Sequence, residues 1–127
     1  MSFSSLLGKK KLLPIIQANN VEEGLNIAKA MVNADINLVE VVLRTEASIE
    51  IIKALKSELP DLSVGAGSVT NADTLKRALD AGSDFILTPS ISKALLTQLS
   101  CCTLPVVPGI STASDILLAK EFGYNEL

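Results

Sequence analysis

The 127-residue chain has the length and composition of one ordinary globular domain, because 48% of its residues are apolar and its formal net charge is only −3. Its basic residues are dispersed apart from three consecutive lysines, so they predict no nucleic-acid-binding surface. The sequence has no histidine, which excludes zinc chemistry and Ser-His-Asp catalysis. No segment approaches the roughly 20 apolar residues of a membrane-spanning helix, and no membrane partner is expected.

The two cysteines, Cys101 and Cys102, are adjacent in the sequence. Adjacent cysteines do not close a loop by a disulfide, and no second pair with metal-ligand spacing is present. They predict buried free thiols in a reducing compartment, the cytoplasm.

Short apolar runs rich in branched side chains alternate with helical patterns along the whole chain. The runs predict strands at 12–17, 36–43, 62–66, 85–88 and 104–107, with a sixth strand beginning near Asn125. Between them, apolar residues at helical spacing predict helices at 21–33, 47–59, 71–81, 92–99 and 112–122. The expected class is α/β, in a single domain spanning residues 1–127.

The strands begin roughly every 20 to 26 residues, a spacing typical of parallel strands joined by right-handed helical crossovers. An open, doubly wound sheet and a (β/α)₈ TIM barrel both fit this repeat. A complete barrel needs about 200 residues, so the chain would supply the first five βα units and the start of the sixth strand. Five strands of a barrel would leave two exposed sheet edges and an uncovered apolar face, and such a fragment is not expected to fold stably alone.

Glu40 lies in the middle of the apolar run Leu38–Leu43. Alternate residues of a strand share a face, so Glu40 should point the same way as Leu38 and Val42. A carboxylate in such a strand requires a partner or a task, because burying its charge alone costs free energy or raises its pKa. It is either half of a structural ion pair or a group that transfers protons.

Arg44 follows Glu40 by four residues and should lie at the carboxyl ends of the strands, where parallel α/β folds build their sites. Its guanidinium suits a carboxylate ligand. The alternative is a surface arginine paired with Glu46.

The other candidate segments also follow strands. Gly65-Ala-Gly67-Ser68 would let a ligand approach the backbone, although it matches neither a dinucleotide fingerprint nor a phosphate loop. Pro89 would form a wall of the pocket, and Ser111 or Thr112 would cap the next helix.

Taken in order, Glu40-Val-Val-Leu-Arg44-Thr45, Gly65-Ala-Gly67-Ser68-Val, Thr88-Pro89 and Val107-Pro-Gly-Ile-Ser-Thr112 resemble the bacterial 2-keto-3-deoxy-6-phosphogluconate (KDPG) and 4-hydroxy-2-oxoglutarate (KHG) aldolases. The resemblance implies a trimeric (β/α)₈ barrel. It also implies a class I, Schiff-base aldolase that cleaves the phosphorylated keto acid to pyruvate and glyceraldehyde 3-phosphate, or 4-hydroxy-2-oxoglutarate to pyruvate and glyoxylate, with neither metal nor cofactor.

The resemblance assigns roles to individual residues. Glu40 matches the general acid/base and Arg44 a residue that holds the pyruvate carboxylate, while Thr45 and Gly67 belong to the same substrate-binding motifs. Ser68 stands where the family usually has threonine, so the hydroxyl is retained. Pro89 matches a pocket-lining proline, but Ser90 replaces the usual glycine.

The family's imine-forming lysine is expected directly after Leu127, so residues 1–127 should not catalyse the reaction alone. A chemically modified lysine at that point would also end the sequence there. None of the chain's own lysines is a suitable substitute, since they precede the first strand or fall in helical patterns.

Two other functions fit the repeat. An epimerase or isomerase acting on a sugar phosphate would explain the βα units but gives no role to Glu40 and Arg44. A non-catalytic assembly protein would use its exposed sheet edges to pair with another chain. The sequence leaves open which keto acid is preferred.

Overall fold

The chain forms a curved, parallel, five-stranded sheet with helices along its outer face. The computed structural model describes residues 1–127. Strands β1 (Ile15–Ile16), β2 (Leu38–Val42), β3 (Ser63–Gly67), β4 (Phe85–Leu87) and β5 (Val106–Val107) are neighbours in the order of the sequence. Helices α2 (Val21–Asn33), α3 (Ser48–Glu58), α4 (Ala72–Asp80), α5 (Lys93–Leu99) and α6 (Ala113–Glu121) each follow one strand. The five βα units expected from the sequence are therefore present.

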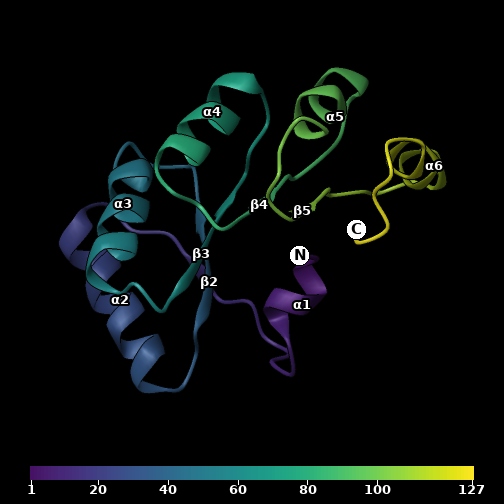
Figure 1. The fold of residues 1–127 in the computed structure, drawn as a ribbon. Helices are drawn as coiled ribbons and strands as arrows, with labels where there is room; N and C mark the ends of the chain where they lie inside the picture. The colour runs from purple at the N-terminus through teal and green to yellow at the C-terminus, as the bar shows by residue number, and fades with distance from the viewer.

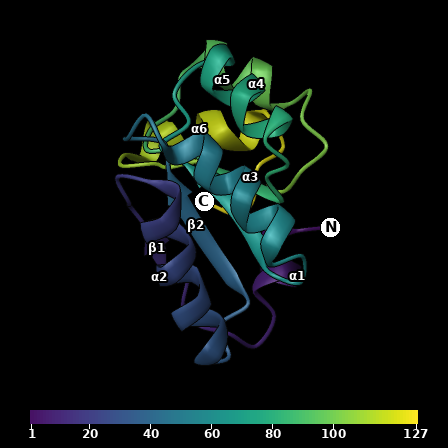
Figure 2. The same cartoon turned by 90° about the vertical axis from the view of Figure 1, so that its left-hand side faces the viewer.

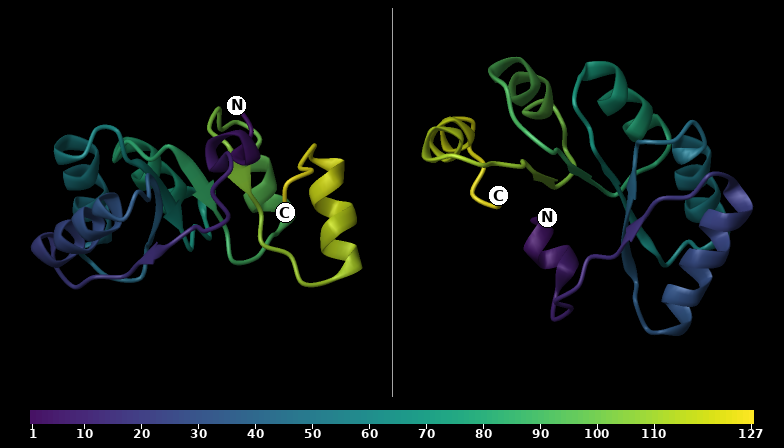
Figure 3. Two further views of the ribbon diagram at one scale, coloured as in Figure 1. Left: turned by 90° about the horizontal axis from the view of Figure 1, so that it is seen from below. Right: turned by 180° about the vertical axis from the view of Figure 1, so that it is seen from behind.

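The direction of winding decides between the two folds that the repeat allowed. Helices α2 to α6 lie on the convex side of the sheet, whereas both ends of the chain lie on its concave side (Figures 1 and 3). A doubly wound sheet reverses its strand order and carries helices on both faces. The unbroken order β1 to β5 is that of a sheet curling toward a barrel, so the doubly wound alternative is wrong.

Four strands, β1, β2, β4 and β5, are shorter than predicted, and in β1 and β5 a proline stands directly before the first paired residue. Pro14 and Pro105 have no N–H to donate, so β1 begins only at Ile15 and β5 only at Val106. Their carbonyl groups still pair with the neighbouring strand: Glu40 N donates to Pro14 O (2.9 Å) and Ile86 N to Pro105 O (3.0 Å). Each proline thus removes one backbone hydrogen-bond donor from its strand without separating that strand from its neighbour.

Most helices begin at a polar side chain that satisfies a free backbone N–H. The N-cap residues are Asn20 for α2, Asn71 for α4, Ser92 for α5 and Thr112 for α6, as expected for Thr112. Helix α3 is the exception, because its N-cap residue Ala47 has no side-chain cap.

The two faces of the sheet have different environments. Val39 and Val41 of β2, with Val64, Ala66 and Ile86 on the following strands, belong to the core that packs beneath the helices. Figure 2 shows α2 and α3 lying across β2 on this side. The alternate residues of the strands therefore face the concave side, and on β2 these include Glu40.

A short helix that the sequence did not predict, α1 (Phe3–Leu7), lies on the concave side (Figure 1). The Phe3 ring packs edge-on against Phe85 of β4, with ring centroids 5.1 Å apart. The Glu126 carboxylate accepts hydrogen bonds from Phe3 N (2.8 Å) and Ser4 N (3.0 Å). A five-residue helix is unstable in isolation, so these long-range contacts account for it.

Two local predictions were wrong. No strand begins near Asn125, because residues 124–127 do not pair with β5 and Glu126 instead binds the first turn of α1. Cys101 is exposed rather than buried, since it lies in the turn after α5, whereas Cys102 is half-buried.

None of the helices has the length and apolar character that crossing a membrane requires.

Candidate active site

Glu40 is a largely buried residue on the concave face of β2. Its residue is only 9% exposed, and it stands level with Ile15 on β1 and Gly65 on β3. No lysine or arginine lies within ion-pairing distance of it, and no hydrogen bond satisfies its oxygens. An ion pair of Glu40 is therefore not observed among residues 1–127.

The glycines of β3 make room for larger side chains. A Cβ on Gly67 would collide with the Glu40 carboxylate, and one on Gly65 would collide with the Phe85 ring. Glu40 thus leans along the sheet toward the carboxyl ends of the strands, over the bare backbone of Gly67. Any larger residue at Gly67 would displace it.

The pKa of Glu40 is raised above its ordinary value. Burial is the main cause, because it disfavours the charged form, and the nearby positive charge of Arg44 opposes the shift. A carboxyl group with a raised pKa holds its proton closer to neutral pH, where it can both donate and accept.

Arg44 lies just beyond the carboxyl end of β2 and is exposed. Its Nε donates a hydrogen bond to the Ser68 Oγ (3.3 Å), which follows β3. None of the ion pairs in the structure involves Arg44, so the alternative of a pair with Glu46 is not observed. The guanidinium remains free to bind an anion at the mouth of the sheet.

Ser68 has an unusual backbone conformation, with φ of 60°. This left-handed region is strained for residues other than glycine, asparagine and aspartate, and is most strained for β-branched ones. The conformation turns the chain sharply after β3 and presents the hydroxyl to Arg44.

Thr45 is tied to the backbone of neighbouring elements. Its hydroxyl donates to Ala18 O (2.9 Å), just after β1, and lies 2.9 Å from the Ser48 Oγ of α3. Ser48 was missed from the sequence, although the spacing Thr45-x-x-Ser48 before an apolar helix is related to that of a capping box.

Pro89 lies two strands away from Glu40, at the carboxyl end of β4, and is exposed. A Cβ on Gly109 would collide with the backbone of Thr88 and Pro89, so the loops after β4 and β5 are in close contact. Gly109 N also donates to Thr88 Oγ1 (3.2 Å). Pro89 therefore belongs to the same rim as Arg44 and Ser68, where the rim is the edge of the sheet at the carboxyl ends of its strands. It does not contact either residue.

None of the lysines is buried. Eight of the nine are exposed, and Lys56 on α3 pairs with Asp84 (2.7 Å), which precedes β4. A lysine that forms an imine needs a desolvated environment to lower its pKa. No group of three or more Cys, Asp or Glu side chains is arranged to bind a metal.

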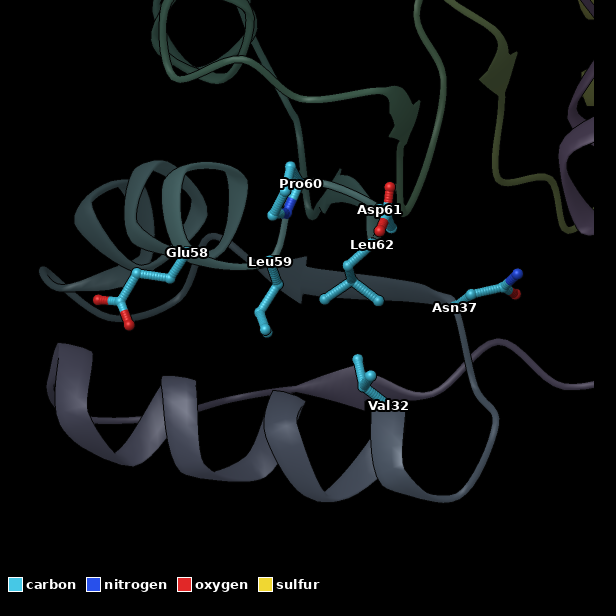
Figure 4. A pocket seen from close by; sticks show the side chains of 7 residues that line it. All are labelled: Val32, Asn37, Glu58, Leu59, Pro60, Asp61 and Leu62. Carbon is cyan, nitrogen blue, oxygen red and sulfur yellow. The ribbon is translucent and has the colours of Figure 1, made fainter.

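A hollow of about 260 Å³ lies at the opposite end of the sheet (Figure 4). It is lined by residues that precede β2 and β3 and by the ends of α2 and α3: Val32, Asn37, Glu58, Leu59, Pro60, Asp61 and Leu62. In barrel-type folds the amino-terminal ends of the strands serve stability, whereas ligands bind at the carboxyl ends. The candidate site is therefore the rim around Glu40 and Arg44.

The chain is an α/β protein with a singly wound parallel sheet, the arrangement from which βα barrels are built, and its candidate site lies at the carboxyl ends of the strands. The family model for KDPG and KHG aldolases matches residues 3–127, and the chain belongs to that family.

Curated relatives cover almost the whole chain. It is 36% identical over 125 residues to 2-dehydro-3-deoxy-phosphogluconate aldolase of Dickeya dadantii, and 35% identical to KHG/KDPG aldolase of Escherichia coli. Each alignment spans 98% of this chain but 59% of the relative.

Solved structures agree in fold. KDPG aldolase of Zymomonas mobilis superposes with a TM-score of 0.90 at 31% identity, covering 97% of this chain and 59% of that one. KDPG aldolase of Legionella pneumophila, in which pyruvate was captured as a covalent carbinolamine, superposes with a TM-score of 0.86 at 29% identity, covering 89% and 55%.

Proposed function

We propose that this chain supplies the proton-transfer and carboxylate-binding part of a class I aldolase that acts on KDPG, and also on 4-hydroxy-2-oxoglutarate. The observation that carries the proposal is the unpaired, buried Glu40 beside the free guanidinium of Arg44. Membership of the aldolase family gives these two groups a common substrate, a 2-keto acid.

Glu40 is the proposed general acid/base. When protonated, it donates to the hydroxyl that leaves the carbinolamine as water. When ionised, it takes the proton from the substrate's 4-hydroxyl as the C3–C4 bond breaks. The electron pair of that bond moves toward the imine nitrogen. Burial keeps both protonation states accessible, because it raises the pKa of the carboxyl group.

Arg44 is the proposed partner of the substrate carboxylate, held in place by Ser68. Thr45 fixes the loop that carries Arg44, Gly67 provides the space for Glu40, and Pro89 forms the far wall of the pocket. The nucleophile is a lysine outside residues 1–127, since the lysines within this range lie on solvated surfaces.

The proposed architecture is a closed eight-stranded barrel in one domain, assembled as a homotrimer in the cytoplasm. Two observations support association. Leu117 on α6 is 66% exposed. A protein cage designed by fusing symmetric oligomeric domains superposes on this chain with a TM-score of 0.80 at 25% identity. Light scattering tests the trimer, and a monomeric mass would contradict it.

Borohydride trapping tests the proposed chemistry in the protein expressed from its complete gene. With pyruvate and borohydride, we expect one reduced pyruvyl group on a single lysine outside residues 1–127, located by peptide mass spectrometry. Omission of pyruvate is the control. Trapping on one of the nine lysines described here, or no trapping, would contradict the proposal.

Substitution tests the role of Glu40. Glu40→Gln keeps the shape of the side chain but removes its proton transfer, so kcat should fall by about 10²- to 10⁴-fold. Glu121→Gln is the matched control, because Glu121 is exposed and ends α6, outside the loops that carry the candidate site residues. Equal activity of the two variants would exclude Glu40 as the acid/base.

A further inference from the structure

Ser48 is a buried hydroxyl at the junction of three elements. It is only 2% exposed, in the first turn of α3, and a hydroxyl buried there costs free energy unless it is hydrogen-bonded. Its Oγ lies 2.9 Å from Val42 O at the end of β2 and 2.9 Å from the Thr45 hydroxyl, and it accepts from Thr45 N (3.2 Å).

The two hydroxyl groups have few hydrogens to share among these partners. A hydroxyl has one hydrogen to donate and two lone pairs that accept. Thr45 gives its hydrogen to Ala18 O, so it can only accept from Ser48. Ser48 has Val42 O, Thr45 O and the Thr45 hydroxyl as alternative acceptors, each at 2.9 Å. The network therefore joins the ends of β1 and β2 to the start of α3.

Arg44 lies inside the span that Ser48 closes. Val42 precedes Arg44 by two residues and Thr45 follows it by one, and Ser48 bonds to both. Leu43 N, on the strand side, donates to Gly67 O (3.0 Å). The only side-chain bond of Arg44 is the 3.3 Å contact to Ser68, so the direction of the guanidinium depends on the backbone that Ser48 fastens.

We propose that Ser48 is a positioning residue that holds the Arg44 loop in the conformation that binds the substrate carboxylate. The inference rests on the proposed function of Arg44. In this proposal Ser48 lies beneath the site and does not contact the substrate, yet it controls how tightly the keto acid binds. Ser48 is also buried at the start of α3, so its structural and positioning effects must be separated.

Kinetics of Ser48→Ala in the protein expressed from its complete gene separate them. Arg44 holds the same carboxylate before and during reaction, so loosening it should raise KM about tenfold and leave kcat nearly unchanged. Ser92→Ala is the matched control, because it removes the hydroxyl that caps α5 at the same end of the sheet without touching the Arg44 loop. Its KM should stay at the wild-type value.

A double-mutant cycle tests the route of the effect. If Ser48 acts through Arg44, Ser48→Ala should not raise KM further in an Arg44→Gln background. Additive increases in the double variant would overturn the proposal, as would a Ser48→Ala variant with wild-type KM.

NMR gives a readout that does not need catalysis. In Ser48→Ala, the amides of Leu43 and Thr45 should exchange faster and the Arg44 Nε–H should become mobile, whereas Ser92→Ala should leave all three unchanged. An unchanged Arg44 signal would overturn the positioning role. Failure of the wild-type protein to trap pyruvate would instead refute the proposed function. In that case the NMR experiment would still test whether Ser48 holds Arg44 in place.

Discussion

The carboxylate of Glu40 occupies the space that a side chain on Gly67 would need. The two residues lie on neighbouring strands, and Gly67 is level with Val42, two residues beyond Glu40. The glycine thus serves as a recess that lets a buried acid reach toward the carboxyl end of the sheet.

Gly67→Ala should destabilise the protein by about 1–3 kcal/mol, because the added methyl group must displace the carboxylate or the backbone. Urea denaturation measures the free energy of unfolding. In a Glu40→Ala background the recess is empty, so the same substitution should cost much less. An equal cost in both backgrounds would show that the glycine is needed for another reason.

Glu40→Gln should stabilise the protein at neutral pH by about 1 kcal/mol, as is common when a group strained for function is removed. Burial raises the pKa of Glu40 in the folded state, so over a window above its ordinary pKa the folded state binds more protons than the unfolded state. Stability from this group therefore falls as pH rises through that window.

Denaturation over a pH series checks the sign. The advantage of Glu40→Gln over the wild type should grow as pH rises and then level off above the folded-state pKa. Glu46→Gln, at an exposed position, should show no such trend. An advantage that shrinks with rising pH would contradict the raised pKa.

Glu126→Gln should loosen α1. The carboxylate accepts two backbone N–H groups of the first turn. The pKa of Glu126 is lowered, first by the Ser4 side chain and then by the backbone N–H groups of Ser4 and Phe3. Their contribution is present above the ordinary pKa and is lost as pH falls through the lowered one. Amide exchange at Phe3 and Ser4 should therefore accelerate in the variant at neutral pH.

The total stability should change by less than about 1 kcal/mol, because the contact is largely solvent-exposed. Glu121→Gln on α6 is a suitable control, as Glu121 is exposed and makes no ion pair. Unchanged exchange at Phe3 in Glu126→Gln would mean that the Phe85 contact alone holds the helix.

Asp84→Ala should destabilise the protein by about 1–3 kcal/mol, because it removes the acceptor that two donors share. One oxygen of Asp84 accepts from both Lys56 Nζ (2.7 Å) and Val64 N (2.7 Å), and both side chains of the ion pair are less than one-third exposed. Thermal or urea unfolding measures the loss.

Asp80→Ala offers the contrast. Asp80 pairs with Lys76 on the exposed face of α4, where 61% and 74% of the two side chains are accessible to solvent. Such pairs contribute little, so this substitution should leave the free energy of unfolding nearly unchanged. Similar effects for the two aspartates would argue against a structural role for Asp84.

The sequence predicted the repeated units because strands and helices differ in the spacing of apolar residues. Alternation in β2 placed Glu40 on the face opposite Val39 and Val41, and the structure confirms this placement. Arg44 at the carboxyl end of β2 was predicted in the same way. The N-cap at Thr112 could be predicted because capping depends on residues only three apart.

Contacts between distant residues were not predictable in this way. Helix α1 depends on Glu126 and Phe85, and neither is near it in the sequence. Ser48 looked like an ordinary helical residue, since its role depends on where Val42 and Ala18 lie in space. The strand expected at Asn125 did not form, because a strand exists only where a neighbour pairs with it.

The sequence by itself determined the five βα units, the buried position of Glu40 and the resemblance to the aldolases, because each follows from spacing within a few residues or from short motifs. Only the tertiary structure decided that the sheet is singly wound, that Gly67 makes room for Glu40, and that Thr45 and Ser48 fasten the loop of Arg44. The physical reason is that strand order, steric fit and hydrogen bonds between elements depend on distances in space, which local periodicity does not encode.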